Sequence, residues 1–245
     1  MPPAESLNLQ PLSARSIVLS LLLGAHPPQR HVRHLLGSAE LFGVSESALR
    51  VALTRMTSAG ELERVDGVYR LNARLLERQR RQDESINART VPWSDEWEQA
   101  IVVVSGRAAA ERAQMRSDLT ALRLSELREG VWMRPANLDR EWPIELEPSL
   151  ARFTARPDSP AHELVATLWD LRAWTATGEA LLQHFSATTD PLTRLTAAAA
   201  IVHHLTTDPV LPDELLPADW PGARLRDTYA AYQAELIALT DAFVG

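Results

Sequence analysis

The stretch "SESALRVALTRMTSAGELERVDGVYRLN", residues 45–72, decides the fold of the N-terminal part of the chain. Ser45 is a typical helix N-cap and Gly60 a typical terminator, so the residues between them are predicted to form a helix. At 100° per residue one face of this helix is apolar; it consists of Ala48, Leu49, Ala52, Leu53 and Met56. Two short alternating strands then flank Asp66-Gly67, which favours a tight β-hairpin.

Two more helices are predicted before this stretch. Ser13 can cap the first, over "ARSIVLSLLLG", and the second covers about residues 31–41, while "HPPQ" between them is read as a loop. Three helices followed by a hairpin is the order of a winged helix-turn-helix, whose third helix enters the major groove while the hairpin touches the backbone. The same pattern also fits a small helical domain whose polar face meets only water, or a module that binds a partner helix.

The polar face of the third predicted helix carries the candidate DNA contacts. Arg50 and Thr54 are expected to read bases, and Ser47 and Arg55 to bind phosphates, although Arg50 could equally contact phosphate alone. The full set predicted to bind double-stranded DNA adds the cap and the hairpin arginines: Ser45, Ser47, Arg50, Thr54, Arg55, Arg64 and Arg70.

Charge is distributed unevenly along the 245 residues. The net charge is −7, yet residues 1–90 hold 12 Arg against 9 acids and residues 91–245 hold 13 Arg against 23 acids. A basic head on an acidic body suggests that only the head approaches polyanions. The chain lacks both Cys and Lys, which excludes disulfides, thiolate metal sites, Schiff-base chemistry and a phosphate-loop lysine. With no signal peptide and no long apolar run, we expect a cytoplasmic protein, and no cofactor.

The sequence predicts a multi-domain α+β protein. Residues 1–90 form the winged helix-turn-helix with a connecting helix, 91–158 a central ferredoxin-like α+β domain, and 159–245 a C-terminal helical domain. In the central domain "QAIVVVSG" is a buried strand, a helix follows with Ala108, Met115, Leu119 and Leu122 inward, and "PIELEPSLARFTA" alternates like a half-exposed strand. The polar stretch "ARLLERQRRQDES" either contacts DNA phosphates through "RQRR" or is a solvated linker.

Three stretches together resemble the PaaX family of bacterial repressors, named for phenylacetate degradation. They are "ARSIVLSLL…LFGVSESALRVALTRMTSAGELER", "LSELREGVWMRPANL" and "DPVLPDELLPADWPGARL", in the family's order and spacing. The resemblance implies a dimeric transcription factor, usually a repressor, of a catabolic operon for phenylacetate or a related aromatic acid. It also implies release from operator DNA by an acyl-CoA thioester such as phenylacetyl-CoA. Where the family commonly has His–acid–aromatic–Arg, this chain has His203, His204, Leu205 and Thr206.

Coenzyme A carries several phosphates, which favour clustered guanidinium groups. The candidate effector contacts are therefore Arg112, Arg116 and Arg123 on the central helix, together with Arg128, Trp132 and Arg134. Arg128, Glu129 and Arg134 could shape a pocket mouth or a dimer contact. A salt-bridged helix edge and a core position for Trp132 are the alternatives. The adjacent His203 and His204 point about 100° apart and cannot easily share a metal. No catalytic motif appears, so we expect the protein not to be an enzyme. An enzyme acting on a CoA thioester or nucleic acid through the ferredoxin-like domain is the alternative function.

Overall fold

The computed structural model describes residues 7, 9–104, 106 and 108–242, with backbone alone for the last two. Packing groups the chain into two compact units. Unit 1 combines residues up to 86 with 177–206 and the segment from 221 onward, and unit 2 combines 87–176 with 207–220. The predicted multi-domain α+β class is confirmed. The three-domain division at residues 90/91 and 158/159 stays a prediction.

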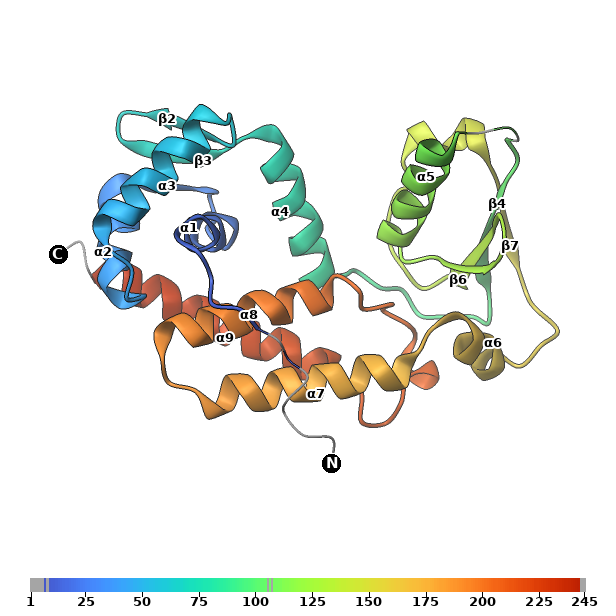
Figure 1. Cartoon of the computed structure of the whole chain (residues 1–245). Coiled ribbons are helices and arrows are strands. Elements are labelled where there is room, and N and C mark those ends of the chain that lie inside the picture. Colours follow the sequence, from blue (N-terminus) through green and yellow to red (C-terminus); the bar gives the residue numbers. More distant parts are fainter. Residues whose placement is uncertain (1–6, 8, 105, 107, 243–245) are drawn as a thin grey trace. The chain divides into compact units, whose positions relative to one another are not determined.

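Unit 1 begins with a winged helix-turn-helix (Figure 1). Its helices are α1 (Ala14–Leu23), α2 (Val32–Leu41) and α3 (Glu46–Ser58). Strands β2 (Leu62–Val65) and β3 (Val68–Leu71) form the predicted hairpin, and β1 (Gln29–His31) joins the other side of β3. Strand β1 was not predicted: Gln29 was assigned to a loop, and His31 to the start of the second helix.

The helix caps and the hairpin turn of the head have the geometry that their residue types predict. The Oγ atoms of Ser13 and Ser45 each accept a hydrogen bond from the backbone amide three residues later in the chain, at 3.2 Å. Asp66 and Gly67 both have positive φ, 48° and 78°, as a two-residue turn of the mirror-image type demands. A Cβ on Gly67 would come within 3.0 Å of His31 Nε2, so the turn needs glycine for space as well as for conformation.

The remaining helices of unit 1 pack around this head. Helix α4 (Ala73–Ile86) follows the hairpin directly; it is the connecting helix that was predicted within residues 1–90, and it belongs to unit 1. Helix α8 (Pro191–Leu205), α9 (Gly222–Ala242) and most of α7 (Leu171–Ala187) complete the unit. Within the described part of the chain, no helix has the length and apolar character needed to cross a membrane.

Unit 2 is built on a four-stranded antiparallel sheet. Its elements are β4 (Trp97–Val102), α5 (Ala109–Ala121), β5 (Ser125–Arg128), β6 (Val131–Pro135) and β7 (Leu150–Ala155). The strand order is β5-β6-β4-β7, so β4 and the helix-linked β5 are separated by β6. This is the split β-α-β arrangement of the predicted ferredoxin-like fold. The 3-10 helix η2 (Ile144–Ser149) occupies the place of a second long helix.

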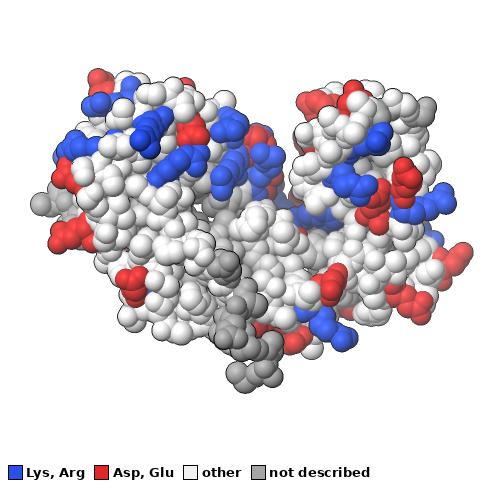
Figure 2. Space-filling view, viewed as in Figure 1, with Lys and Arg blue, Asp and Glu red and all other residues white. Residues whose placement is uncertain are grey.

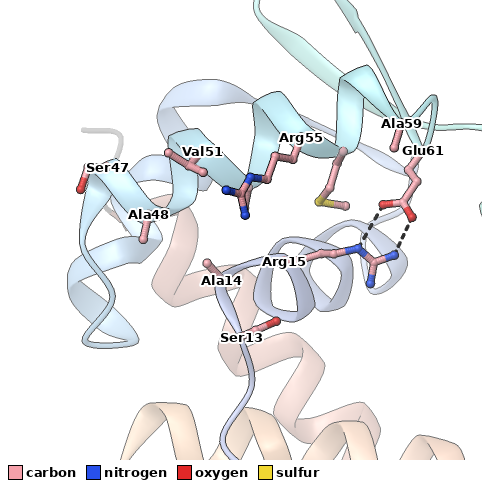
Figure 3. A pocket seen from close by; sticks show the side chains of 11 residues that line it. Ser13, Ala14, Arg15, Ser47, Ala48, Val51, Arg55, Ala59 and Glu61 are labelled. Carbon is pink, nitrogen blue, oxygen red and sulfur yellow. Dashed lines mark hydrogen bonds and ion pairs between the residues drawn. The ribbon is translucent and has the colours of Figure 1, made fainter.

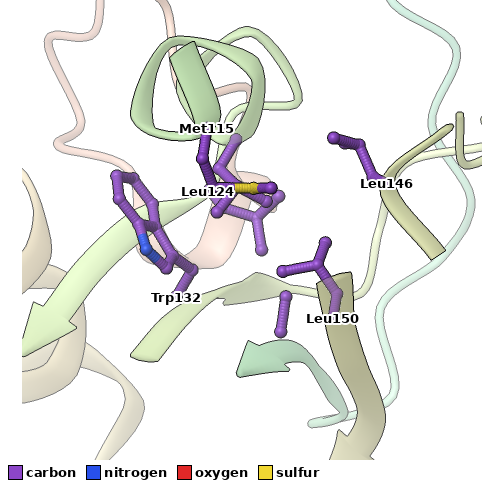
Figure 4. Close-up of a cluster of buried hydrophobic side chains, with 7 residues drawn as sticks. Met115, Leu124, Trp132, Leu146 and Leu150 are labelled. Atoms are coloured by element: carbon purple, nitrogen blue, oxygen red, sulfur yellow. The ribbon is translucent and has the colours of Figure 1, made fainter. Parts of the chain in front are cut away.

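Both faces of this sheet carry a hydrophobic core. Alternate residues point to opposite faces, so Ala100 and Trp132 pack under α5 with Met115, Leu119, Leu124, Leu146 and Leu150 (Figure 4). Trp97 and Met133 lie on the other face with side chains from helix α6 (Ala161–Leu168) and the 3-10 helix η3 (Asp213–Leu215). The core position weighed for Trp132 is thus confirmed.

Two predictions about unit 2 are wrong in detail. Ile144 and Leu146 were expected on a half-exposed strand, but they lie on η2, and the strand begins only at Leu150. The apolar–polar alternation of the sequence misled because exposure here follows a turn and not a strand: Ile144 is 72% exposed, whereas Leu146 and Leu150, four residues apart, are buried. Ala108 was expected to point inward, yet it is the exposed N-cap of α5.

Candidate nucleic-acid interface

Helix α3 presents the polar face that its sequence predicts. Leu49, Ala52, Leu53 and Met56 are buried against the rest of the head. The exposed residues are Glu46, Ser47, Arg50, Val51, Thr54, Arg55 and Ser58. A helix that is fixed on one side and polar on the other can be laid into a DNA groove without disturbing its own core.

The side chains of this face already have local partners. Arg50 Nε donates to Glu46 Oε1 at 2.9 Å, and a second guanidinium nitrogen contacts the same oxygen. The pairing of Arg50 with Glu46, one helical turn earlier, was not predicted from the sequence. Both members of the pair are more than half exposed, and such pairs contribute only about 0.3–0.5 kcal/mol. A phosphate or a guanine edge can therefore displace Glu46.

The hydroxyl groups of the face differ in what they can still bind. Ser45 Oγ accepts from the Ala48 amide at 3.2 Å and lies 3.0 Å from Ser47 Oγ, so its main task is capping. Thr54 Oγ1 donates to the Arg50 carbonyl at 2.9 Å. Its lone pairs remain available, which leaves Thr54 able to accept a hydrogen bond from a base amino group.

A groove of about 670 Å³ runs along one flank of α3, between that helix and the start of α1 (Figure 3). Arg55 and Val51 line its α3 side, and Ser13 and Arg15 its α1 side. Arg15 donates two hydrogen bonds to Glu61, at 2.6 and 3.1 Å. These bonds hold the pKa of the Glu61 carboxyl below its usual range. Arg15 is thus neutralised, whereas no carboxylate within the described residues pairs with Arg55.

The two hairpin arginines leave opposite faces of the small sheet. Arg64 lies opposite Tyr69 and its guanidinium carbon is 5.7 Å from that ring. Arg70 lies directly across from Glu63. Both are exposed. Their different faces mean that a flat surface docked on one side of the hairpin meets only one of them.

The candidate effector residues are scattered over unit 2. Arg112 and Arg128 are exposed. Arg116 pairs with Glu126 and lies over the ring of Trp132, 5.6 Å from its centroid. Arg123 has positive φ and donates to the Asp208 carbonyl. Within the set, Arg116 contacts Trp132, and Arg134 Nη1 donates to the Arg123 carbonyl at 3.4 Å. A shared effector pocket stays a prediction.

The prediction that Arg134 lies at a pocket mouth is wrong, because its side chain is 0% exposed. It donates to the carbonyls of Pro135, Pro209 and Val210 at 3.0–3.1 Å, and to Asn137 Oδ1 at 2.7 Å. Its Nε lies 3.3 Å from Glu98 Oε1. Burial lowers the pKa of Arg134, and Glu98 acts against that shift. Arg134 therefore holds residues 209–210 against the sheet within unit 2.

Three family models match successive parts of the chain. They are described as PaaX-like protein, PaaX protein central Cas2-like domain and PaaX-like protein C-terminal domain, and they match residues 13–75, 90–154 and 169–245. The first model covers the three helices and the hairpin of the head. The second covers the four-stranded sheet of unit 2.

A solved structure is similar to this chain over nearly its full length. The uncharacterized protein Rv0674 from Mycobacterium tuberculosis is 47% identical, with a TM-score of 0.84, over 95% of this chain and 99% of that one. No curated protein matches the chain. The order of the three models and this likeness over nearly the full length agree with one another. The chain belongs to the PaaX family, whose membership points to a transcriptional regulator.

Proposed function

We propose that this protein binds operator DNA through unit 1 and represses a catabolic operon for phenylacetate or a related aromatic acid. The observation that carries the DNA-binding part is the exposed face of α3, where Arg50, Thr54 and Arg55 stand on a rigid helix beside a hairpin. Arg50 and Thr54 are the base-reading candidates, while Ser47, Arg55 and one of the two hairpin arginines, Arg64 or Arg70, contact the phosphate backbone.

Release from DNA is proposed to follow binding of an acyl-CoA thioester such as phenylacetyl-CoA. This part rests on the family to which the chain belongs. A ligand loosens DNA only if it binds the DNA-incompetent arrangement more tightly than the competent one. Arg112, Arg116 and Arg128 are the members of the predicted effector set whose side chains are exposed, while Arg134 is occupied inside unit 2.

The protein is further proposed to act as a homodimer in the cytoplasm. Two heads related by a two-fold axis read two half-sites about one helical turn, or a multiple, apart. A palindromic operator with salt-sensitive affinity follows from that geometry.

The test uses the full-length protein and duplexes from upstream of its own gene and of neighbouring catabolic genes. We expect fluorescence anisotropy to show binding at least a thousandfold tighter to one of these fragments than to a mixed-sequence duplex of equal length. Phenylacetyl-CoA should then release the protein, whereas coenzyme A alone should not. Equal affinity for every duplex at physiological salt would remove the regulatory proposal.

A further inference from the structure

Helix α4 is an integral part of the winged head. Gln79 is 5% exposed, and its amide donates to the carbonyls of Leu23 and Ala25 at 2.7 and 2.9 Å. These carbonyls end α1, where a helix leaves its backbone acceptors unsatisfied. Leu75 is buried one turn earlier. The helix is therefore held in a fixed position relative to α1, and through α1 relative to α3.

The outward side of α4 carries a stripe of arginines. Arg74, Arg78 and Arg81 are spaced by four and three residues, which places them on one face of the helix. All three are exposed, Arg74 by 74% and Arg81 by 59% of their side chains. Arg80 points about 120° away from the middle of this stripe.

The carboxylates near the stripe neutralise it only weakly. Arg74 lies 3.8 Å from Glu61, and Arg81 lies 3.9 Å from Glu77. Each of these acids has a closer partner, since Glu61 binds Arg15 and Glu77 binds Arg80. Arg78 has no carboxylate partner within the described residues. Exposed pairs at such distances contribute about 0–1 kcal/mol and are readily exchanged for a stronger anion.

The stripe begins at the edge of the groove beside α3. Glu61 lines that groove together with Arg55 and also lies within reach of Arg74. Figure 2 shows blue side chains over α3 and over α4 on the same face of unit 1. Two arginine-bearing helices on one face present several exposed guanidinium groups, which suits a polyanion such as duplex DNA.

We propose that Arg74, Arg78 and Arg81 bind the phosphate backbone of duplex DNA next to the segment contacted by α3. This inference rests on the proposed function and extends it, because α4 then adds affinity without adding sequence information. The guanidinium groups replace condensed counterions, so their contribution is seen in the salt dependence of binding.

The experiment compares two double variants of the full-length protein with equal loss of charge. Arg78→Gln/Arg81→Gln removes two of the three arginines of the stripe, and Arg172→Gln/Arg224→Gln is the control, since these two exposed arginines lie on α7 and α9. Binding to a labelled 30-bp duplex of mixed sequence is followed by anisotropy between 50 and 200 mM NaCl. We expect the slope of log affinity against log salt to fall by about 0.9 for each lost contact in the stripe variant, and to stay unchanged in the control.

A lysine pair, Arg78→Lys/Arg81→Lys, separates charge from structure. It should keep the wild-type slope, because an ammonium group is also a phosphate ligand. Equal slopes for the wild type, the stripe variant and the control would overturn the α4 proposal while leaving DNA binding by α3 intact. If the wild type binds no duplex even at 50 mM NaCl, the proposed function and this inference fail together.

Discussion

The guanidinium group has opposite surroundings in two regions of the molecule. It is exposed on α3 and α4 of unit 1, and it is buried at Arg134 inside unit 2. Arg50, Arg74 and Arg78 stand in solvent with weak partners or none within the described residues. Arg134 is sealed inside unit 2 among carbonyls, an amide oxygen and Glu98. All 25 basic residues of the chain are arginine, so residue type alone separates neither group. Burial and the number of acceptors decide which arginine stabilises the fold and which remains free for a polyanion.

The energetic consequence differs as much as the exposure. A buried charge is tolerated when hydrogen bonds and an opposite charge compensate it. Removing one partner leaves the other polar groups buried and unpaired, which costs their desolvation free energy. A solvent-exposed guanidinium is hydrated in the free protein, so its removal barely changes stability. Stability measurements should therefore respond to Arg134, and DNA-binding measurements to α3 and α4.

The largest expected effect is at the buried site. Arg134→Met should lower the free energy of unfolding of unit 2 by about 3–5 kcal/mol, because Asn137 and the carbonyls of Pro209 and Val210 lose their donor. All seven tryptophans of the chain lie in unit 2. Urea denaturation followed by tryptophan fluorescence thus reports on this unit.

The matched control for that change is Arg128→Met on β5, whose side chain is exposed. It should alter the same unfolding free energy by less than about 0.5 kcal/mol. If both variants unfold at the same urea concentration, the contrast between buried and exposed arginines is lost.

An intermediate effect is expected on α3. Arg50→Ala should cost about 1–3 kcal/mol of operator affinity and relax specificity at one base pair. Unfolding should change by no more than the exposed Glu46 pair contributes, about 0.5 kcal/mol. Anisotropy titrations over single-base operator variants make the measurement. A loss that is uniform over all variants would assign Arg50 to a phosphate and leave base reading to Thr54.

The smallest effect is expected at Glu61, which joins Arg15 and Arg74 at the edge of the groove. Hydrogen bonds from Arg15 lower the pKa of this carboxyl, so the pair stabilises unit 1 above the ordinary glutamate pKa and loses this contribution as pH falls through the lowered value. Glu61→Gln should therefore cost about 1 kcal/mol at pH 7 and progressively less below about pH 4. Circular dichroism at 222 nm during urea denaturation at several pH values measures this difference.

Local signals were enough to predict α3 and the hairpin. Ser45 acts through its side chain on an amide three residues later. Gly60 and Asp66-Gly67 act through their own backbone conformation, and the apolar period of α3 is uninterrupted. Strand β1 was missed because its pairing partner β3 lies some 40 residues later, Gln29 opposite Arg70. The Arg15–Glu61 contact was missed for the same reason, since the two residues are 46 positions apart.

The candidate effector site was predicted less well, for a different physical reason. Arg134 looked like a ligand for phosphates because its acceptors are mainly backbone carbonyls, and a carbonyl leaves no trace in residue type. The connecting helix α4 was underrated because the one buried polar side chain that fixes it, Gln79, resembles any other residue of a solvated helix. Arg50, in contrast, was placed correctly because helical period alone fixes the face on which it lies.

The attachment of residues 207–220 to unit 2 limits how the molecule can be divided into fragments. A peptide covering only residues 87–176 would keep the guanidinium of Arg134 but lack Pro209 and Val210, so it should collapse or aggregate when expressed alone. Adding a synthetic 207–220 peptide in trans should restore it, as one half of a split protein rescues the other. We therefore expect residues 207–220 to be a separable segment that residues 87–176 need in order to fold.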